Sequence, residues 1–168
     1  MKLIEPNMEY EQEWINYIRE IQENDGAIIP KAMDGDIHNY KQFLKEKEQN
    51  KTSPFDKNLV PSILYFMVDG SRIIGVADLR LCLNDFLLQY GGHIGYSIRP
   101  SERGNGYGNM ILKLVLEKCK EMELSPVLVT CKKTNQASAK VIMKNGGILE
   151  NELVWNEEKQ QRYWIHIK

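Results

Sequence analysis

The chain has 168 residues, of which 42% are hydrophobic and 27% charged, an ordinary composition for a folded globular protein. Its formal net charge of -1 gives no overall basic field, so we expect no nucleic-acid partner. A chain of this length is most simply one domain, and we therefore expect residues 1–168 to form a single unit.

The N-terminal stretch lacks the apolar core of a signal peptide, and no apolar run approaches the roughly 18 residues that span a bilayer. We therefore expect a cytoplasmic protein with no membrane partner. Three cysteines cannot all pair, and none stands in a Cys-x-x-Cys pair, so we expect neither a disulfide framework nor a metal site. They are Cys82, Cys119 and Cys131.

The first part of the chain predicts a short strand, two helices and a long loop. Residues 3–4 are apolar, and apolar side chains at helical spacing predict a helix over residues 8–24. A second helix is expected after Asp36, with the Lys-Glu-Lys-Glu run at 45–48 in water. Residues 49–61 carry prolines and polar side chains without periodicity, so they predict a loop, and loops of this length are often functional.

The middle of the chain predicts a hairpin and a further strand. Residues 63–68 and 72–83 flank an Asp-Gly pair, which is typical of a hairpin turn. Residues 84–92 interrupt this pattern, and we expect a turn of helix or a flap there. In residues 94–98 large side chains alternate with small or polar ones, which predicts a strand with one covered face.

The last third predicts a broad amphipathic helix, a buried strand, a shorter helix that ends at two glycines, and a terminal hairpin. The expected ranges are 110–122, 127–130, 135–144, and 148–155 with 162–167. The whole order predicts an α/β fold of the α+β kind, in which helices cover one layer of mixed sheet.

Three glycines, Gly104, Gly106 and Gly108, lie between the strand at 94–98 and the long helix. Each removes a Cβ and lets backbone N–H groups turn toward one point. The start of the helix adds about half a positive charge and roughly four free N–H donors. We therefore expect this turn to bind an anion, with Arg103 adding a guanidinium.

Glycine-rich turns before helices also occur in nucleotide-binding folds. This turn has neither the Gly-x-x-x-x-Gly-Lys-Ser/Thr of a P-loop nor the Gly-x-Gly-x-x-Gly of dinucleotide binders. A purely structural role, in which the glycines only let the helix pack closely on its strand, does not readily explain three alternating glycines directly after an arginine.

The run Arg103-Gly-Asn-Gly-Tyr-Gly108 resembles the Arg/Gln-x-x-Gly-x-Gly/Ala signature of the GNAT superfamily of acetyl-CoA-dependent N-acetyltransferases. The strand before it is similar to that family's coenzyme-binding strand. Asn135-Gln-Ala-Ser138 and the later Lys144-Asn-Gly146 resemble the helix that the family places after its next strand. The resemblance covers essentially the whole chain and implies a GNAT-like fold, with about six to seven mostly antiparallel strands and about four helices.

The resemblance implies transfer of an acetyl group from acetyl-CoA, as co-substrate and without a metal, to an amine. It implies that the glycine turn binds the pyrophosphate, that the backbone of the strand binds the pantetheine arm, and that the later helix also contacts the coenzyme. Asn135 is in addition a good helix N-cap, and capping could be its only role. The implied coenzyme-binding residues are Tyr96, Ser97, Ile98, Arg103, Gly104, Asn105, Gly106, Tyr107, Gly108, Asn135 and Ser138.

The tyrosine that the family often uses to protonate the thiolate falls at Ile142, so no general acid is carried over. We consider two catalytic candidates: His93, because imidazole titrates near neutral pH, and Tyr96 as an acid. A histidine at a strand end is also commonly a surface or capping residue, and protons could move through water. A non-catalytic CoA-binding sensor or scaffold is the alternative function.

No motif identifies the acceptor amine. In this architecture the first two helices, the 49–61 loop and the terminal hairpin would wall the acceptor pocket. Small amines, amino acids, antibiotics and protein N-termini all stay open, as does a homodimer formed through the edge strands of the hairpin. Acidic residues that could attract a cationic amine, each also explained by solvated surface charge, are Asp34, Asp36, Asp56 and Glu152.

Overall fold

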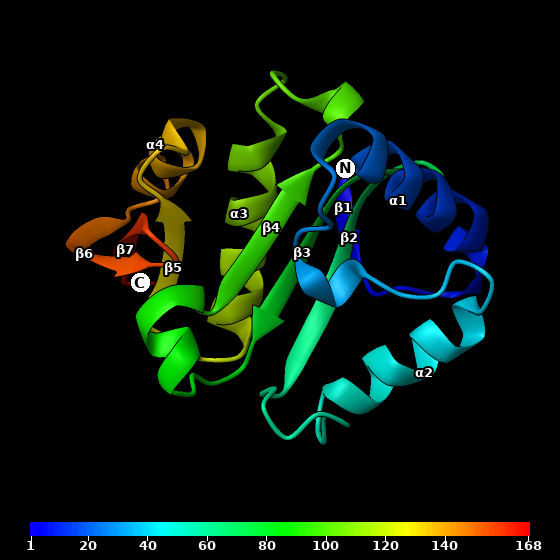
Figure 1. Cartoon of the computed structure of the whole chain (residues 1–168), viewed down its shortest axis with the longest axis horizontal. Helices are drawn as coiled ribbons and strands as arrows, with labels where there is room; N and C mark the ends of the chain where they lie inside the picture. The colour runs from blue at the N-terminus through cyan, green and yellow to red at the C-terminus, as the bar shows by residue number, and fades with distance from the viewer.

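The computed structural model describes residues 1–168, and its strands and α-helices follow the predicted order. Seven strands and four α-helices, joined by short helical turns, give the predicted α+β fold (Figure 1). The helices are α1 (Glu11–Asp25), α2 (Tyr40–Asn50), α3 (Tyr107–Glu121) and α4 (Gln136–Lys144). The strands are β1 (Lys2–Ile4), β2 (Ser62–Asp69), β3 (Arg72–Arg80), β4 (Ile94–Ile98), β5 (Val127–Lys132), β6 (Ile148–Trp155) and β7 (Glu158–Ile165).

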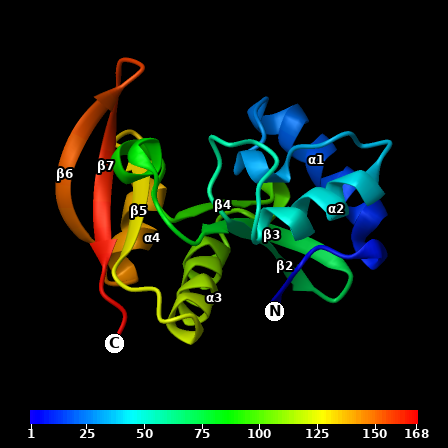
Figure 2. The same cartoon turned by 90° about the horizontal axis from the view of Figure 1, so that it is seen from below.

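The strands form two sheets, whereas the sequence predicted one layer. The first has the order β1-β2-β3-β4 and the second the order β5-β7-β6, and all neighbours are antiparallel. Strands β4 and β5 lie where the sheets meet (Figure 1), and Figure 2 shows the second sheet turned away from the first. The edge of β4 that faces β5 is therefore not part of a ladder.

His93 and Leu128 explain why the two sheets do not merge. The His93 backbone N–H donates to the Leu128 carbonyl over 2.7 Å, and the Leu128 N–H donates to Nδ1 of the His93 ring over 2.9 Å. Because the ring nitrogen accepts the bond that a backbone carbonyl would accept in a ladder, pairing does not continue from this point. The two strands are joined at one end and separate toward the other.

Two hydrophobic cores lie on opposite faces of the first sheet. Along β2, Leu64 and Phe66 pack toward α1 and α2, while Tyr65 and Met67 pack toward α3. Both faces of this sheet are covered, so β2 is an almost continuous apolar run instead of an alternating one.

No helix combines the length and the apolar character that crossing a membrane requires.

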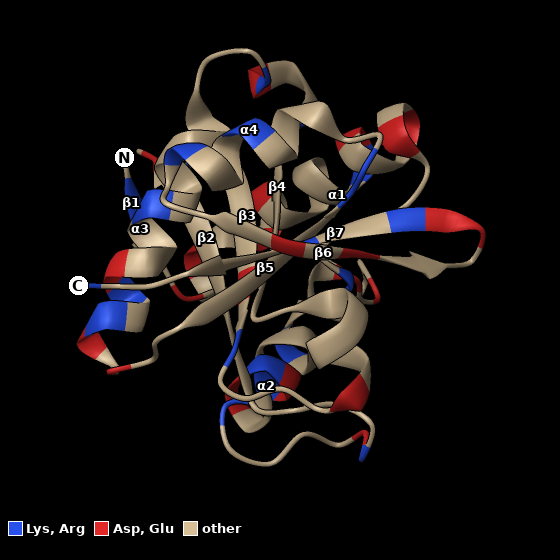
Figure 3. Ribbon diagram, turned by 90° about the vertical axis from the view of Figure 1, so that its left-hand side faces the viewer, with Lys and Arg blue, Asp and Glu red and all other residues tan.

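In the view of Figure 3, basic and acidic residues are interspersed along the ribbon. Both signs appear along α3 and on the β6–β7 hairpin. This pattern agrees with the near-zero net charge of the chain.

Several boundaries differ from the predicted ones. The second helix begins at Tyr40, where Asn39 accepts a capping hydrogen bond from the Gln42 N–H, and not directly after Asp36. Its Glu46 and Lys47 are half-buried, so the prediction that 45–48 lies wholly in water was wrong at these two residues. Residues 84–92 contain a π-helical turn, Leu87–Gly91.

Candidate functional site

The glycine turn adopts a backbone that only glycine accepts readily. Gly104 and Gly106 have φ of 84° and 80°, in the left-handed region, and no atom lies within 4 Å of the Cβ that either residue lacks. Gly106 is the N-cap of α3, so the helix begins directly at the turn. The sequence therefore uses these glycines for conformation and an open approach, and not for close helix packing.

A cavity of about 590 Å³, here called the glycine-turn cavity, opens at this turn between β4 and the first turns of α3 and α4. Among its lining residues are nearly all of the predicted coenzyme-binding residues. Asn105 does not line it, because its side chain turns back and donates to the Glu102 carbonyl over 3.2 Å. The predicted residues that the cavity brings together are Tyr96, Ser97, Ile98, Arg103, Gly104, Gly106, Tyr107, Gly108, Asn135 and Ser138.

Tyr96 and Ser138 join β4 to α4 across the cavity. Their hydroxyl oxygens lie 3.1 Å apart and share a hydrogen bond. Burial raises the pKa of Tyr96, and the hydrogen bond with Ser138 opposes that rise only in part. Asn135 caps α4 by accepting from the Ser138 N–H over 3.1 Å, so its side-chain oxygen already has a structural use.

The Ser97 side chain faces α1 and is fully occupied there. Its hydroxyl donates to the Ile29 carbonyl over 2.5 Å and lies 3.0 Å from the hydroxyl of Tyr17, which donates to it. Any contact of Ser97 with a ligand in the cavity is therefore left to its backbone, as the sequence analysis expected.

Arg103 is held by an acidic residue that the sequence did not single out. Its Nη1 donates to Oδ1 of Asp25 over 2.9 Å, its Nη2 pairs with Oδ2, and its Nε donates to the Ile98 carbonyl over 3.1 Å. The hydrogen bonds from Arg103 hold the pKa of Asp25 below its usual range. Asp25 also lines the glycine-turn cavity, so a carboxylate stands beside the candidate anion site.

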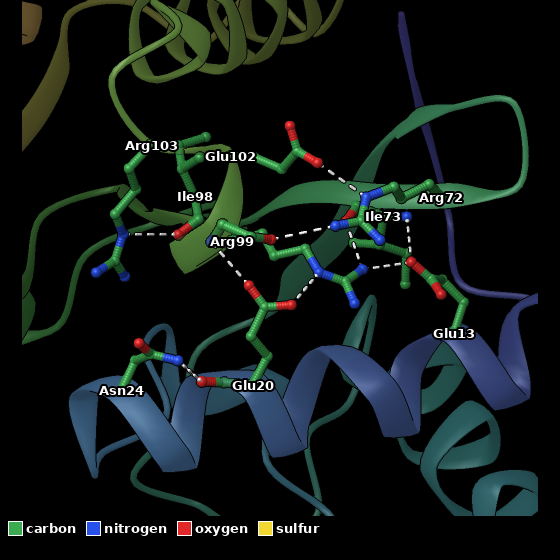
Figure 4. A network of polar contacts seen from close by, with 10 residues as sticks. Glu13, Glu20, Asn24, Arg72, Ile73, Ile98, Arg99, Glu102 and Arg103 are labelled. Carbon is green, nitrogen blue, oxygen red and sulfur yellow. Dashed lines mark hydrogen bonds and ion pairs between the residues drawn. The ribbon is translucent and has the colours of Figure 1, made fainter.

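A buried arginine fixes the base of the turn to α1 (Figure 4). Arg99 is 4% exposed, and its guanidinium bonds Glu13, Glu20 and the Ile73 carbonyl. The other oxygen of Glu20 accepts from the Ser101 N–H over 2.7 Å. Sequence reasoning missed this network, although two glutamates two helical turns apart, with an arginine directly after an apolar strand, were a usable signal.

His93 lies away from the candidate site. It is buried, it lines neither large cavity, and its Nδ1 accepts the Leu128 N–H. Burial, with the charge of Arg80, lowers the pKa of His93 to about 4. The ring is therefore neutral near pH 7 and joins the two sheets, so this geometry lends no support to the catalytic role predicted for it.

Ile142 occupies the position where the family places its tyrosine. It is completely buried in the core between α3, α4 and the sheet. The side chain at this position therefore faces other apolar groups and does not line the glycine-turn cavity.

A second cavity of about 590 Å³, here called the α2 cavity, lies between α2 and the end of β3. Its walls come from α2, the loop before β2, the end of β3 and residues 84–87. Of the acidic residues proposed from sequence, Asp56 lines it, whereas Asp34, Asp36 and Glu152 do not.

The two cavities approach each other at Gly95. Nη2 of Arg80, a residue of the α2 cavity, lies 3.0 Å from the position that a Cβ of Gly95 would take, and Pro30 lies 3.4 Å from it. Gly95 directly precedes Tyr96 of the glycine-turn cavity. The segment 29–32 also adjoins both, since Ile29 lines the glycine-turn cavity and Lys31 lines the α2 cavity. A molecule in one cavity can therefore come close to a molecule in the other beside Gly95.

Comparisons with known proteins agree with this geometry. Residues 16–148 match a protein-family model described as an acetyltransferase (GNAT) domain. No curated protein matches the sequence of the chain at the level required for a relative.

Solved structures of similar fold cover nearly the whole chain. They include the ribosomal-protein-S5-alanine acetyltransferase from Vibrio fischeri, with a TM-score of 0.71, 19% identity, and 98% of this chain and 91% of that chain covered. The microcin C7 self-immunity acetyltransferase MccE, solved in complex with acetyl-CoA and AMP, has a TM-score of 0.70 and 17% identity, with 98% of this chain and 91% of that chain covered. A chimera of the spermidine N-acetyltransferase SpeG from Vibrio cholerae and hSSAT has a TM-score of 0.68 and 13% identity, with 99% of this chain and 96% of that chain covered.

These identities are low, so the structural likeness establishes the fold alone, which is GNAT-like as predicted. The family model, in contrast, matches most of the chain. The chain therefore belongs to the GNAT family of N-acetyltransferases.

Proposed function

We propose that this enzyme transfers the acetyl group of acetyl-CoA to a primary amine and binds the coenzyme in the glycine-turn cavity. One observation carries this proposal. Two glycines with a left-handed backbone and the first turn of α3 line a cavity that also reaches Tyr96. Similar structures were solved with acetyl-CoA (MccE) and with CoA (the ribosomal L7/L12 α-N-protein acetyltransferase RimL).

The coenzyme pyrophosphate would lie at the start of α3. The free N–H groups of residues 104–108 and the positive end of the helix dipole favour a diphosphate there. Arg103 would turn from Asp25 toward the phosphate oxygens, which it can bind in the same bidentate way.

The pantetheine arm would run along β4. This strand pairs with β3 on one edge, while its other edge separates from β5 beyond His93. The amide groups of the arm can hydrogen-bond the backbone of Tyr96, Ser97 and Ile98 as an added strand would. The thioester would then lie close to Tyr96.

Tyr96 and Ser138 provide the proton for the leaving group in this proposal. The amine nitrogen forms a bond to the thioester carbonyl carbon, and a backbone N–H of β4 stabilises the charge on the oxygen. The attacking nitrogen is that of the neutral amine, because the ammonium loses one proton to solvent before attack, and the nitrogen loses a second proton to solvent once the bond has formed. The carbon–sulfur bond then breaks, the Tyr96 hydroxyl protonates the thiolate, and the phenolate regains a proton from solvent. Because the raised pKa of Tyr96 keeps it protonated near pH 7, it can act as an acid where Ile142 cannot.

Two further predictions made from the sequence belong to this proposal. The acceptor is an amine-bearing molecule, as the spermidine and ribosomal-protein acetyltransferases among the similar structures illustrate for themselves. The two cores share one sheet, which supports the proposal that residues 1–168 form a single catalytic domain.

Gly108 offers a matched test of the coenzyme site. A Cβ there would make only an ordinary contact, 3.5 Å from Val141, and an acidic residue in the first turn of α3 suits the helix dipole. Gly108→Glu should therefore fold but repel the diphosphate, while Gly108→Gln introduces nearly the same bulk without charge. We expect calorimetry to give at least about tenfold weaker CoA binding for Gly108→Glu than for Gly108→Gln.

Other outcomes would decide against the proposal or against one part of it. Equal CoA affinity in the two variants would place the coenzyme elsewhere. Protection from thermal unfolding by ATP but not by CoA would indicate a nucleotide site instead. CoA binding without thiol release from acetyl-CoA, across a broad panel of amines, would favour the sensor or scaffold.

A further inference from the structure

The α2 cavity contains a buried carboxylate that is only half satisfied. Asp78 is 5% exposed, and its Oδ2 accepts from Nε of Arg80 over 3.0 Å. Its Oδ1 is the one buried side-chain polar atom of the chain that has no hydrogen-bond partner. A buried carboxylate oxygen without a donor is costly, so a donor at this position would be bound favourably.

The same cavity contains a cation without an ion-pair partner, whose Nζ lies 5.1 Å from the centroid of the Phe43 ring. Lys47 of α2 is half-buried, and no carboxylate oxygen lies within 4.0 Å of its Nζ. Burial lowers the pKa of Lys47, and the charge of Asp78 opposes that shift. Both groups line the α2 cavity, and they form no ion pair with each other.

Asp78 also stands at the end of the α2 cavity that faces the proposed reaction centre. In the β3–β4 ladder Asp78 is directly opposite Gly95, and Ala77 is opposite Tyr96. Directly opposite residues in an antiparallel pair lie roughly 5 Å apart at their Cα atoms and share a face of the sheet. An ammonium bound to Asp78 would thus lie beside the residue that separates the two cavities.

We propose that the α2 cavity is the acceptor site and that it selects zwitterionic amines, with the ammonium on Asp78 and a carboxylate on Lys47. This inference rests on the proposed function and specifies its substrate class: a free α-amino acid or a close derivative. A zwitterion satisfies both the free Oδ1 of Asp78 and the ammonium of Lys47 at once, which neither a simple amine nor a carboxylic acid does.

The charges around the site argue against the other acceptor classes. The cavity is lined by as many basic as acidic side chains, so the second positive charge of a polyamine would meet no net negative charge there. The basic residues are Lys31, Lys47 and Arg80, and the acidic ones are Glu46, Asp56 and Asp78. A peptide N-terminus has an amide where an amino acid has its carboxylate, so it would leave Lys47 unpaired.

The outer wall of the cavity accommodates an apolar side chain. Phe55, Leu59 and Phe86 line it and are 59%, 55% and 47% exposed. Large apolar residues at the mouth of a cavity favour a ligand that covers them. The geometry therefore favours amino acids with apolar side chains.

The test compares amines that differ only in the carboxylate. Leucine, leucinamide and 3-methylbutylamine, followed by the other common amino acids with their amides, are supplied with acetyl-CoA, and thiol release gives kcat/KM. We expect at least one amino acid to exceed its amide about tenfold, because a hydrogen-bonded charge pair is worth about that factor. Lys47→Met should reduce this ratio to about one, and Asp78→Asn should lower kcat/KM for every amine about tenfold or more.

Lys45→Met is the matched control, since Lys45 lies exposed on the same helix outside the cavity. Lys45→Met should keep the wild-type ratio of kcat/KM between an amino acid and its amide. CoA affinity, measured by calorimetry, should stay the same in all three variants, and Lys47→Met carries the test if Asp78→Asn does not fold.

The inference is overturned if Lys47→Met keeps the wild-type ratio, or if no amino acid releases thiol while an amide, a peptide or spermidine does. In both cases CoA still binds and the proposed function stands. Failure to bind CoA or to acetylate any amine would instead remove the proposed function, and this inference with it.

Discussion

Arg99 at the end of β4 and Glu20 on α1 are joined by a hydrogen bond of 2.6 Å between Nε and Oε2 (Figure 4). Glu20 accepts the Ser101 N–H with its other oxygen, so one carboxylate holds both the strand end and the start of the segment that leads to Gly104. The position of the candidate coenzyme site therefore depends on α1, which contributes little to its lining.

Glu20 should make stability depend on pH in a defined direction. Burial alone would raise the pKa of Glu20, but hydrogen bonds from Ser101 and Arg99 outweigh it and hold the pKa below its usual value. A group with a lowered folded-state pKa stabilises fully above its unfolded-state pKa, about 4.3, and loses that contribution as pH falls through the folded-state value. We expect Glu20→Gln to lower the free energy of unfolding by about 1 kcal/mol at pH 7.

Urea denaturation between pH 7 and pH 3 tests this expectation. The difference between wild type and Glu20→Gln should shrink once the pH falls below the unfolded-state pKa. Glu23→Gln, an exposed neighbour on α1, is the control and should change stability little at either pH. A difference that stays constant with pH would show that the charge of Glu20 contributes nothing.

Asp25 should compete with the coenzyme for Arg103. The carboxylate lines the glycine-turn cavity and engages both terminal nitrogens of the guanidinium. Asp25→Asn removes the competing negative charge, so we expect CoA to bind several-fold more tightly in calorimetry, whereas Arg103→Ala should weaken binding about tenfold. Weaker binding in Asp25→Asn would mean that Asp25 orients Arg103 for the phosphates.

The order of elements followed from the sequence because local patterns determine it. The apolar spacing of α1 and α3, the Asp-Gly turn between β2 and β3, and the Gly146 stop after α4 each depend on a few neighbouring residues. The division into two sheets did not follow, because it depends on a side-chain nitrogen of His93 that accepts a bond from a strand 35 residues away.

The same distinction separates the two halves of the candidate site. The glycine turn could be predicted from the sequence, because the prediction depends on consecutive residues. Two ion pairs could not be predicted from the sequence. Arg103 and Asp25 are separated by 78 positions along the chain. The pair of Asp78 and Arg80 is local, but it matters only through the cavity that α2 and β3 enclose. Lys47 was assigned to water because charge runs on helices usually are solvated, and tertiary packing decided otherwise.

Tyr96 should control turnover and not coenzyme affinity. If its hydroxyl protonates the thiolate, Tyr96→Phe removes the acid but keeps the ring, and kcat should fall about a hundredfold while the Kd for CoA stays within about twofold. Ser138→Ala should have a smaller effect, because it removes only the hydrogen-bond partner of Tyr96. Unchanged kcat in Tyr96→Phe would assign the proton to water.

Burial raises the pKa of Tyr96, so the wild-type rate should not fall between pH 7 and pH 9 through loss of this proton. If the rate decreases because Tyr96 loses its proton, the decrease should occur above pH 9 and should be absent from Tyr96→Phe. Thiol release measured across this range separates the acid from a merely structural tyrosine.

Ile142→Tyr should not restore the tyrosine that the family often uses. Ile142 is completely buried, and Gly147, which lacks a Cβ, packs so closely on it that a Cβ there would stand 2.5 Å from its Cγ2. A tyrosine would overpack this core and bury a hydroxyl without a partner, so we expect a loss of about 1–3 kcal/mol in the free energy of unfolding and no gain in kcat. Ile142→Leu, which conserves volume, should cost less. A stable Ile142→Tyr variant with higher kcat than wild type would mean that α4 can turn this position toward the coenzyme, and Tyr96 would then lose its assignment as the acid.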